Sequence, residues 1–217
     1  FTRKGLLQSR LLLDYPTVTD GPNLSRNYLD KVAASAREAS TLVRAAWGSY
    51  KTPVDYGIRS LDLNKVAAMI NAGLPSQLFY VSFRHNAFDT HVHQNAQHGR
   101  LLSYASDAIA GFMKDMERIG RADDVNVLVF SEFGRRVAEN TSLGTDHGTA
   151  NHMYVIGKPV KGGHYGDAPS LTNLDEDGNL IFTTDFRRVY ASLIEGWLKH
   201  DSKVLLGGDF KTFPLYV

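Results

Sequence analysis

The sequence contains no cysteine, which excludes disulfides, thiolate metal sites and cysteine nucleophiles. It also has almost no net charge, because 24 Lys and Arg residues face 23 Asp and Glu residues and leave a formal charge of +1. Such a balance creates no overall field that would recruit nucleic acid or an anionic membrane. No apolar run approaches the roughly 20 residues that cross a bilayer. We therefore expect no nucleic-acid partner and no membrane span.

The length of 217 residues suits one substantial hydrophobic core, and we expect residues 1–217 to form a single α/β domain. The first residue, Phe1, is not a start residue, and the segment that follows it lacks the apolar stretch of a signal peptide. We interpret the chain as the C-terminal part of a longer precursor.

Apolar periodicity separates predicted helices from predicted strands. Helical spacing marks four segments: residues 24–47, 61–72, 101–119 and 185–197. β-Branched and aromatic residues mark three strands: residues 77–84, 125–130 and 153–156. The order of strand, helix and strand between residues 77 and 130 predicts a βαβ unit with parallel strands. The expected fold is a mixed, mainly parallel sheet with helices on both faces.

Residues of metal-ligand type follow the first two predicted strands. They are Asp89, His91 and His93 after the first strand, and Glu132, Asp146 and His147 after the second. Neighbouring parallel strands end at the same edge of a sheet, where open α/β folds bind their ligands, so the two sets should meet. Carboxylate oxygens and imidazole nitrogens suit Zn, Mn, Fe or a similar divalent ion. The sequence therefore predicts a site for one or two such ions.

The first set allows two ligand pairs. An extended segment places Asp89 and His91 on one side, whereas a helical segment places Asp89 beside His93. The β-branched residues Thr90 and Val92 favour the extended form. Each residue also has an ordinary structural interpretation, because carboxylates at loop starts often cap helices and histidines in polar loops are usually solvated.

Arg135 follows the second predicted strand and is the candidate for substrate binding. A guanidinium near a metal would hold an anionic substrate group through two parallel hydrogen bonds. The alternative is a salt bridge to a neighbouring carboxylate.

Three segments together resemble the DUF1501 family, a bacterial group placed within the alkaline phosphatase and sulfatase-like superfamily. They are FDTHVHQ at 88–94, LVFSEFGRR at 128–136 and GTDHGTANHMYVIGKPVKGGHYGD at 144–167. The resemblance extends over roughly residues 25–200. It implies an alkaline phosphatase-like fold that lacks its N-terminal strands in this chain, with divalent metals at the C-terminal ends of strands.

The resemblance also implies roles for single residues. Asp89 with one of the nearby histidines is similar to a carboxylate–imidazole pair that ligates one metal. Glu132 occupies the place where relatives carry the Asp of an Asp-His pair, and His147 is similar to the later histidine ligand. Phe133 stands where those relatives have the second ligand of the pair, so a two-metal site would be incomplete. The superfamily's nucleophile comes from an N-terminal region, and no residue of this chain is assigned that role.

These features predict a metal-dependent, hydrolase-like protein of the phosphatase or sulfatase type that acts on a small anionic phosphate or sulfate ester. Relatives of this kind are typically exported, so the resemblance implies a periplasmic or cell-surface location. The alternative is a catalytically inactive relative that serves as a binding or structural component of an exported assembly. Its partners would be its own N-terminal part or other members of that assembly.

Overall fold

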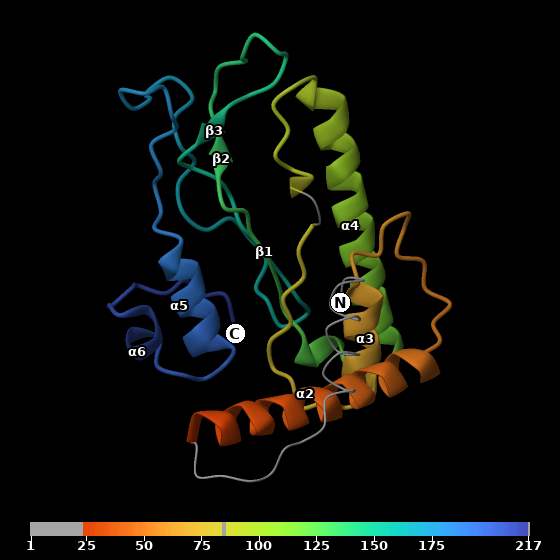
Figure 1. Ribbon diagram of the computed structural model, residues 1–217. Coiled ribbons are helices and arrows are strands. Elements are labelled where there is room, and N and C mark those ends of the chain that lie inside the picture. The colour runs from red at the N-terminus through yellow and green to blue at the C-terminus, as the bar shows by residue number, and fades with distance from the viewer. Residues whose placement is uncertain (1–23, 84–85, 217) are drawn as a thin grey trace. The chain divides into compact units, whose positions relative to one another are not determined.

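The computed structural model describes residues 24–83 and 86–216, and Figure 1 shows their helices and strands. The described residues group into two compact units. One contains the residues up to Val54 together with Asp62–Val81, and the other contains Asp55–Leu61 together with the residues from Ser82 onward.

The first unit contains two helices that the sequence predicts, α2 (Leu24–Ser49) and α3 (Leu63–Asn71). The two helices pack against each other, and α3 buries the apolar face that its spacing predicts. Asp62 precedes α3 with a left-handed φ of 64°, and its carboxylate accepts a 2.6 Å hydrogen bond from Lys65 Nζ. Its side chain makes no capping hydrogen bond to the helix backbone, so Asp62 starts α3 without the side-chain cap typical of aspartate.

The segment 77–83 differs from the sequence-based expectation, because it forms no strand in the structure. Residue 84, the last of the predicted strand, lies outside the described residues. Leu78 and Tyr80 are exposed, whereas a strand within a parallel sheet would bury such side chains. Every pair of strands in the described part of the chain is antiparallel. A mainly parallel sheet therefore remains a prediction from the sequence.

The second unit contains the long helix α4 (Gln94–Arg118), followed by the short 3-10 helix η2 (Ala122–Asp124). Helix α4 begins seven residues before the predicted start at residue 101, because its first turns are polar and give no apolar periodicity. Its buried face carries Ala108, Phe112 and Met116, as the helical spacing predicts.

An irregular antiparallel ribbon forms the second part of this unit (Figure 1). Strand β1 (Val127–Val129) pairs with β4 (Tyr154–Ile156), and strand β2 (Gly134–Arg135) pairs with β3 (His147–Gly148). Val129 pairs with Tyr154, and the next paired residues are Gly134 and Gly148. One side of the ribbon therefore advances five residues between these pairs, and the other side advances six. The register therefore shifts by one residue, which is the effect of a β-bulge.

Gly134 is required where the two sides of this ribbon approach each other. A Cβ atom at this position would lie 1.7 Å from the carbonyl oxygen of Ala150. A side chain there would push the two sides apart, so the glycine after β1 permits the close backbone approach.

Two helices complete the second unit, α5 (Arg187–Gly196) and α6 (Ser202–Leu206), and they pack against each other. The Asp185 carboxylate accepts a 2.9 Å hydrogen bond from the Arg187 backbone N–H, and α5 begins at Arg187, two residues after the predicted start. Among the helices that the structure describes, none combines the length and apolar character that a membrane crossing requires.

Candidate functional site

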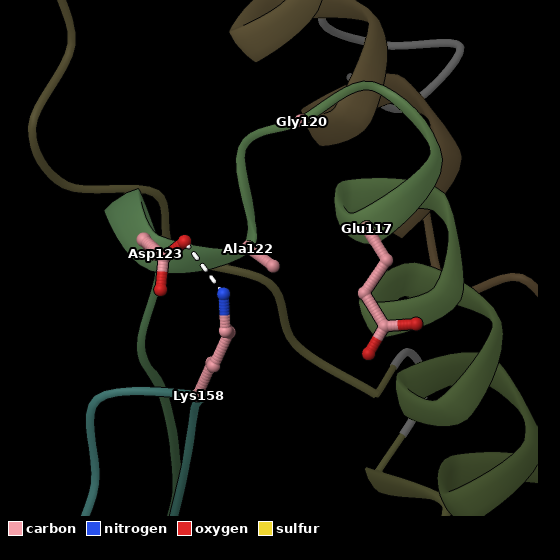
Figure 2. A pocket seen from close by; sticks show the side chains of 5 residues that line it. All are labelled: Glu117, Gly120, Ala122, Asp123 and Lys158. Carbon is pink, nitrogen blue, oxygen red and sulfur yellow. Dashed lines mark hydrogen bonds and ion pairs between the residues drawn. The ribbon is translucent and has the colours of Figure 1, made fainter.

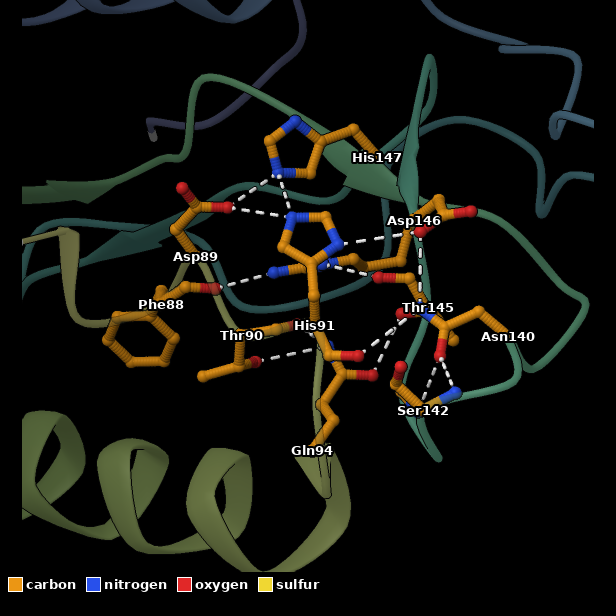
Figure 3. Close-up of polar contacts among 12 residues, drawn as sticks. Phe88, Asp89, Thr90, His91, Gln94, Asn140, Ser142, Thr145, Asp146 and His147 are labelled. Atoms are coloured by element: carbon orange, nitrogen blue, oxygen red, sulfur yellow. Dashed lines mark hydrogen bonds and ion pairs between the residues drawn. The ribbon is translucent and has the colours of Figure 1, made fainter.

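Three of the six predicted ligand residues converge on one point in the second unit. Asp89 Oδ1 lies 3.0 Å from His91 Nε2 and 2.7 Å from His147 Nε2. The two Nε2 atoms are 3.1 Å apart, and Figure 3 shows the carboxylate and both rings turned toward one another. Within the described part of the chain, this is the group of acidic and histidine side chains whose ligand atoms lie close enough to hold one metal ion.

The spacing and chemistry of these atoms fit a shared divalent ion. Two ligand atoms about 2.1 Å from an ion lie roughly 3.0–3.4 Å apart at octahedral or tetrahedral angles. The two distances to His91 Nε2 fall at the short end of this range, and the 2.7 Å contact between Asp89 and His147 is a hydrogen-bond length. Two imidazoles and one carboxylate on one side of an ion leave its remaining positions open.

Electrostatics favour an ionised carboxylate at the centre of this group. The hydrogen bond from the His147 side chain holds the pKa of Asp89 below its usual value, and the His91 side chain contributes in the same direction. An anionic Asp89 between two imidazoles supplies the negative charge that a divalent cation requires.

Asp146 lies behind the cluster rather than within it. Its Oδ1 atom is 3.5 Å from His91 Nδ1, the ring nitrogen that faces away from Asp89, and it accepts a 3.1 Å hydrogen bond from Asn140 Nδ2. The Asn140 hydrogen bond is the main reason why the pKa of Asp146 is lowered, with His91 contributing next. A carboxylate on that side favours the tautomer that carries its proton on Nδ1 and leaves Nε2 free to bind a metal.

His93 and Glu132 are not part of the cluster. His93 precedes α4 with a left-handed φ of 45°, and its backbone N–H donates to the Ser142 carbonyl at 2.9 Å. Glu132 is exposed and lies outside the group of convergent ligand atoms. The structure thus unites Asp89 with His91, which is the pair expected from a segment that is not helical.

Phe133, the neighbour of Glu132, takes the place beside His147. The two rings stack in parallel, with centroids 3.7 Å apart and an angle of 13° between their planes. This contact restricts the rotation of the His147 ring and keeps Nε2 directed at Asp89. Phe133 therefore orients one of the three convergent side chains.

Arg135 connects the two segments that carry the cluster. Its Nη2 donates to the Phe88 carbonyl and its Nη1 donates to the Thr145 carbonyl, both at 2.6 Å. These carbonyls directly precede Asp89 and Asp146 in the sequence. Burial lowers the pKa of Arg135, and the two nearby carboxylates oppose that shift. In this arrangement the guanidinium holds the backbone, and the role of Arg135 in binding a substrate anion stays a prediction from the sequence.

Two further residues join the same segments and carry no sequence signal of a metal site. Gln94 Nε2 donates to the Thr90 carbonyl at 2.9 Å, and Gln94 Oε1 accepts from Thr145 Oγ1 at 2.8 Å. Asn140 bridges to His91 and Asp146 (Figure 3). Their amide side chains are neither the carboxylates nor the imidazoles that indicate a site for Zn²⁺ or Mn²⁺, so the sequence gives no signal of their role.

Two hollows of the surface lie away from the cluster. One of about 310 Å³ sits beside the end of α4, where Lys158 Nζ donates to Asp123 Oδ2 at 2.8 Å, and Figure 2 shows this ion pair. The other, of about 250 Å³, lies between α5 and the C-terminal segment. Neither is lined by a residue of the cluster, but Asp89 and His147 are exposed, so a small ligand can reach them directly.

The match to a known family covers this site completely. Residues 72–201 match the family described as "Protein of unknown function (DUF1501)", and all three convergent residues lie within that range. No curated protein and no solved structure matches the chain. Because the match extends over more than half of the 217 residues, the chain belongs to the DUF1501 family.

Proposed function

We propose that this chain is a metal-dependent, hydrolase-like protein of the phosphatase or sulfatase type that acts on a small phosphate or sulfate ester. The observation that carries the proposal is the convergence of Asp89 Oδ1, His91 Nε2 and His147 Nε2 on one point. In this proposal the three side chains hold a divalent ion such as Zn²⁺ or Mn²⁺. Asp146 behind His91 supports it, because ligating imidazoles usually have a carboxylate or carbonyl at their other nitrogen.

A bound divalent ion would supply Lewis acidity and stabilise negative charge on an ester oxygen. The protein's residues would prepare the site for this chemistry. Asp89 provides the anionic ligand, Asp146 holds the proton of His91 on Nδ1, and the Phe133 ring fixes the plane of His147. Asp89 and His147 are exposed, so a small anionic ester can approach from solvent.

The superfamily, the fold class and the cellular location of the protein are part of the same proposal. The three sequence segments support membership of the alkaline phosphatase and sulfatase-like superfamily, with a mixed, mainly parallel sheet and export to the periplasm or cell surface. The antiparallel ribbon of β1 with β4 is compatible with such a sheet, because mixed sheets often carry antiparallel neighbours.

Metal content tests the proposal directly. The purified protein is dialysed with Zn²⁺ or Mn²⁺, freed of excess ions and measured by elemental analysis. We expect bound metal in the wild type and its loss in Asp89→Ala and His147→Ala. His164→Ala is the matched control, because His164 is exposed and lies outside the cluster. A metal-free wild type would refute the proposal.

Turnover separates the two functional alternatives. Aryl phosphates and aryl sulfates report ester hydrolysis, and we expect activity that disappears in Asp89→Ala. The inactive-relative alternative is favoured by one observation, namely that both terminal nitrogens of Arg135 are bonded to backbone carbonyls. Bound metal without turnover, together with a stable complex on native gels, would support a binding or structural role; robust turnover would exclude it.

A further inference from the structure

We propose that Asn140 positions His91 for metal binding by holding both the backbone of His91 and the carboxylate that faces its ring. The inference rests on the proposed function and deepens it, because it assigns a supporting role to a residue outside the ligand set. The Asn140 side chain makes hydrogen bonds with both its nitrogen and its oxygen, and Figure 3 shows it beside the cluster.

The oxygen of the Asn140 amide shapes its own loop. Oδ1 accepts hydrogen bonds from the backbone N–H groups of Ser142 at 2.9 Å and Gly144 at 3.1 Å. The Asn140 backbone N–H in turn donates to the Gly144 carbonyl at 2.8 Å. These bonds close residues 140–144 into a tight turn, a role that asparagine performs well because its side chain mimics the backbone.

The nitrogen of the same amide reaches the cluster. Nδ2 donates to the His91 carbonyl at 3.2 Å and to Asp146 Oδ1 at 3.1 Å. Two donors and two accepted hydrogen bonds use the full capacity of the side chain. The partners also fix the orientation of the amide, because its nitrogen faces two acceptors and its oxygen faces two donors.

Backbone hydrogen bonds hold the loop of residues 140–144 beside the segment that carries His91. The Ser142 and Leu143 carbonyls accept hydrogen bonds from the backbone N–H groups of His93 and Gln94 at 2.9 and 3.0 Å. A Cβ atom on Gly144 would lie 2.2 Å from the His91 carbonyl oxygen, so only glycine permits this approach. Because the loop and the His91 segment are in direct backbone contact, a shift of the loop caused by a substitution at Asn140 would also move His91.

The consequence for His91 follows from the position of Asp146. Without the Asn140 hydrogen bond, Asp146 has one restraint fewer and is free to turn away from His91 Nδ1. The imidazole then loses the partner that favours its Nδ1–H tautomer, and Nε2 is no longer held as the metal-binding nitrogen. We expect Asn140 to act through Asp146 and through the backbone, without contact to the metal itself.

Gln94 provides a matched control for a merely structural role. Like Asn140, it links the two segments of the site by side-chain hydrogen bonds, here to Thr90 and Thr145. Among the residues that the structure describes, the Gln94 side chain makes no hydrogen bond to His91 or Asp146. Gln94→Met and Asn140→Leu therefore both weaken the link between the segments, and only the second removes the support of His91.

The test is Co²⁺ binding, measured by competition with a chelator and by the visible spectrum of the bound ion. We expect Asn140→Leu and Asn140→Asp to weaken Co²⁺ binding by about 10- to 100-fold and to shift the visible bands, as for other partners of metal ligands. Asn140→Asp retains the oxygen that shapes the loop but places a second carboxylate against Asp146. An added negative charge alone would strengthen cation binding, so weaker Co²⁺ binding in Asn140→Asp would come from lost positioning. Gln94→Met also loosens the link between the segments, so it should lower Co²⁺ affinity but leave the positions of the visible bands as in the wild type.

A second measurement addresses His91 without any metal. Imidazole ¹⁵N shifts report the surroundings of each ring nitrogen, and we expect the His91 Nδ1 shift to change in Asn140→Leu, because Asp146 then no longer stays beside that nitrogen. Wild-type Co²⁺ affinity, visible spectrum and Nδ1 shift in both Asn140 variants would overturn this inference and leave the proposed function standing. A wild type that binds no Co²⁺ would overturn both.

Discussion

Replacing Arg135 by methionine distinguishes a backbone clamp from a substrate-binding residue. The guanidinium donates to the Phe88 and Thr145 carbonyls, both at 2.6 Å, and so joins the segments of Asp89 and Asp146. A hydrogen bond from a charged donor contributes about 1.5–3 kcal/mol. Because Arg135 is only half-buried, water will compensate part of this loss, and we expect Arg135→Met to lower the free energy of unfolding by about 2–4 kcal/mol.

Urea unfolding of the metal-free protein measures this change, and metal affinity should fall in parallel because the two segments separate. Arg135→Lys retains the charge but lacks the fork that spans two carbonyls, so it should recover no more than about half of the loss. If Arg135 instead held a substrate anion, Arg135→Met would leave the unfolding midpoint and the metal affinity unchanged and would raise only the KM for the ester. That result would refute the clamp.

Three of the remaining predictions concern the metal and one concerns stability at high pH. Phe133→Leu should weaken metal binding by roughly tenfold, about 1.4 kcal/mol, because His147 loses its stacked neighbour; chelator competition measures this, and unchanged affinity would contradict the positioning role. The chain should bind one ion, and Glu132→Ala should leave the elemental content unchanged, whereas loss of an ion would return Glu132 to the ligand set. Metal occupancy should fall as the pH falls through about 6, because protonated imidazole does not ligate; full occupancy at about pH 5 would argue against histidine ligands. Burial raises the pKa of Tyr216 to about 12, so its contribution to stability should be complete below about pH 10 and disappear as the pH rises through 12, which tyrosine absorbance and thermal unfolding can follow; a phenol that titrates near 10 would contradict it.

The sequence could predict the helices and the convergent side chains for different reasons. Apolar periodicity identified α2 and the later part of α4, because a buried helix face repeats its apolar residues. The β-branched residues Thr90 and Val92 disfavour a helix and so predict that Asp89 and His91 lie side by side, as they do in the structure. Both inferences depend on local chemistry, and local chemistry is what a single sequence records.

Strand pairing could not be inferred in the same way. An apolar run such as residues 125–130 fits a buried strand in a parallel or an antiparallel arrangement equally well, since the direction depends on a partner elsewhere in the chain. The structure pairs its core, β1, with β4 in antiparallel orientation. The one-residue register shift between the two ladders is likewise invisible in the sequence, although Gly134 marks the close approach beside it.

The motifs contain more residues of metal-ligand type than the structure brings together, and Asp146 shows why. Asp146 and His147 are neighbours in the sequence, yet in the structure they serve different tasks: His147 Nε2 faces Asp89, and Asp146 faces the opposite nitrogen of His91. Residue type cannot separate these tasks, because a carboxylate can bind an ion or hold the ring that binds it. What decides is which imidazole nitrogen the carboxylate meets. Asp146 contacts His91 and Asn140, and Phe133 stacks on His147. In the proposed site, Asp89, His91 and His147 would therefore hold a single ion, and these supporting residues would set its geometry.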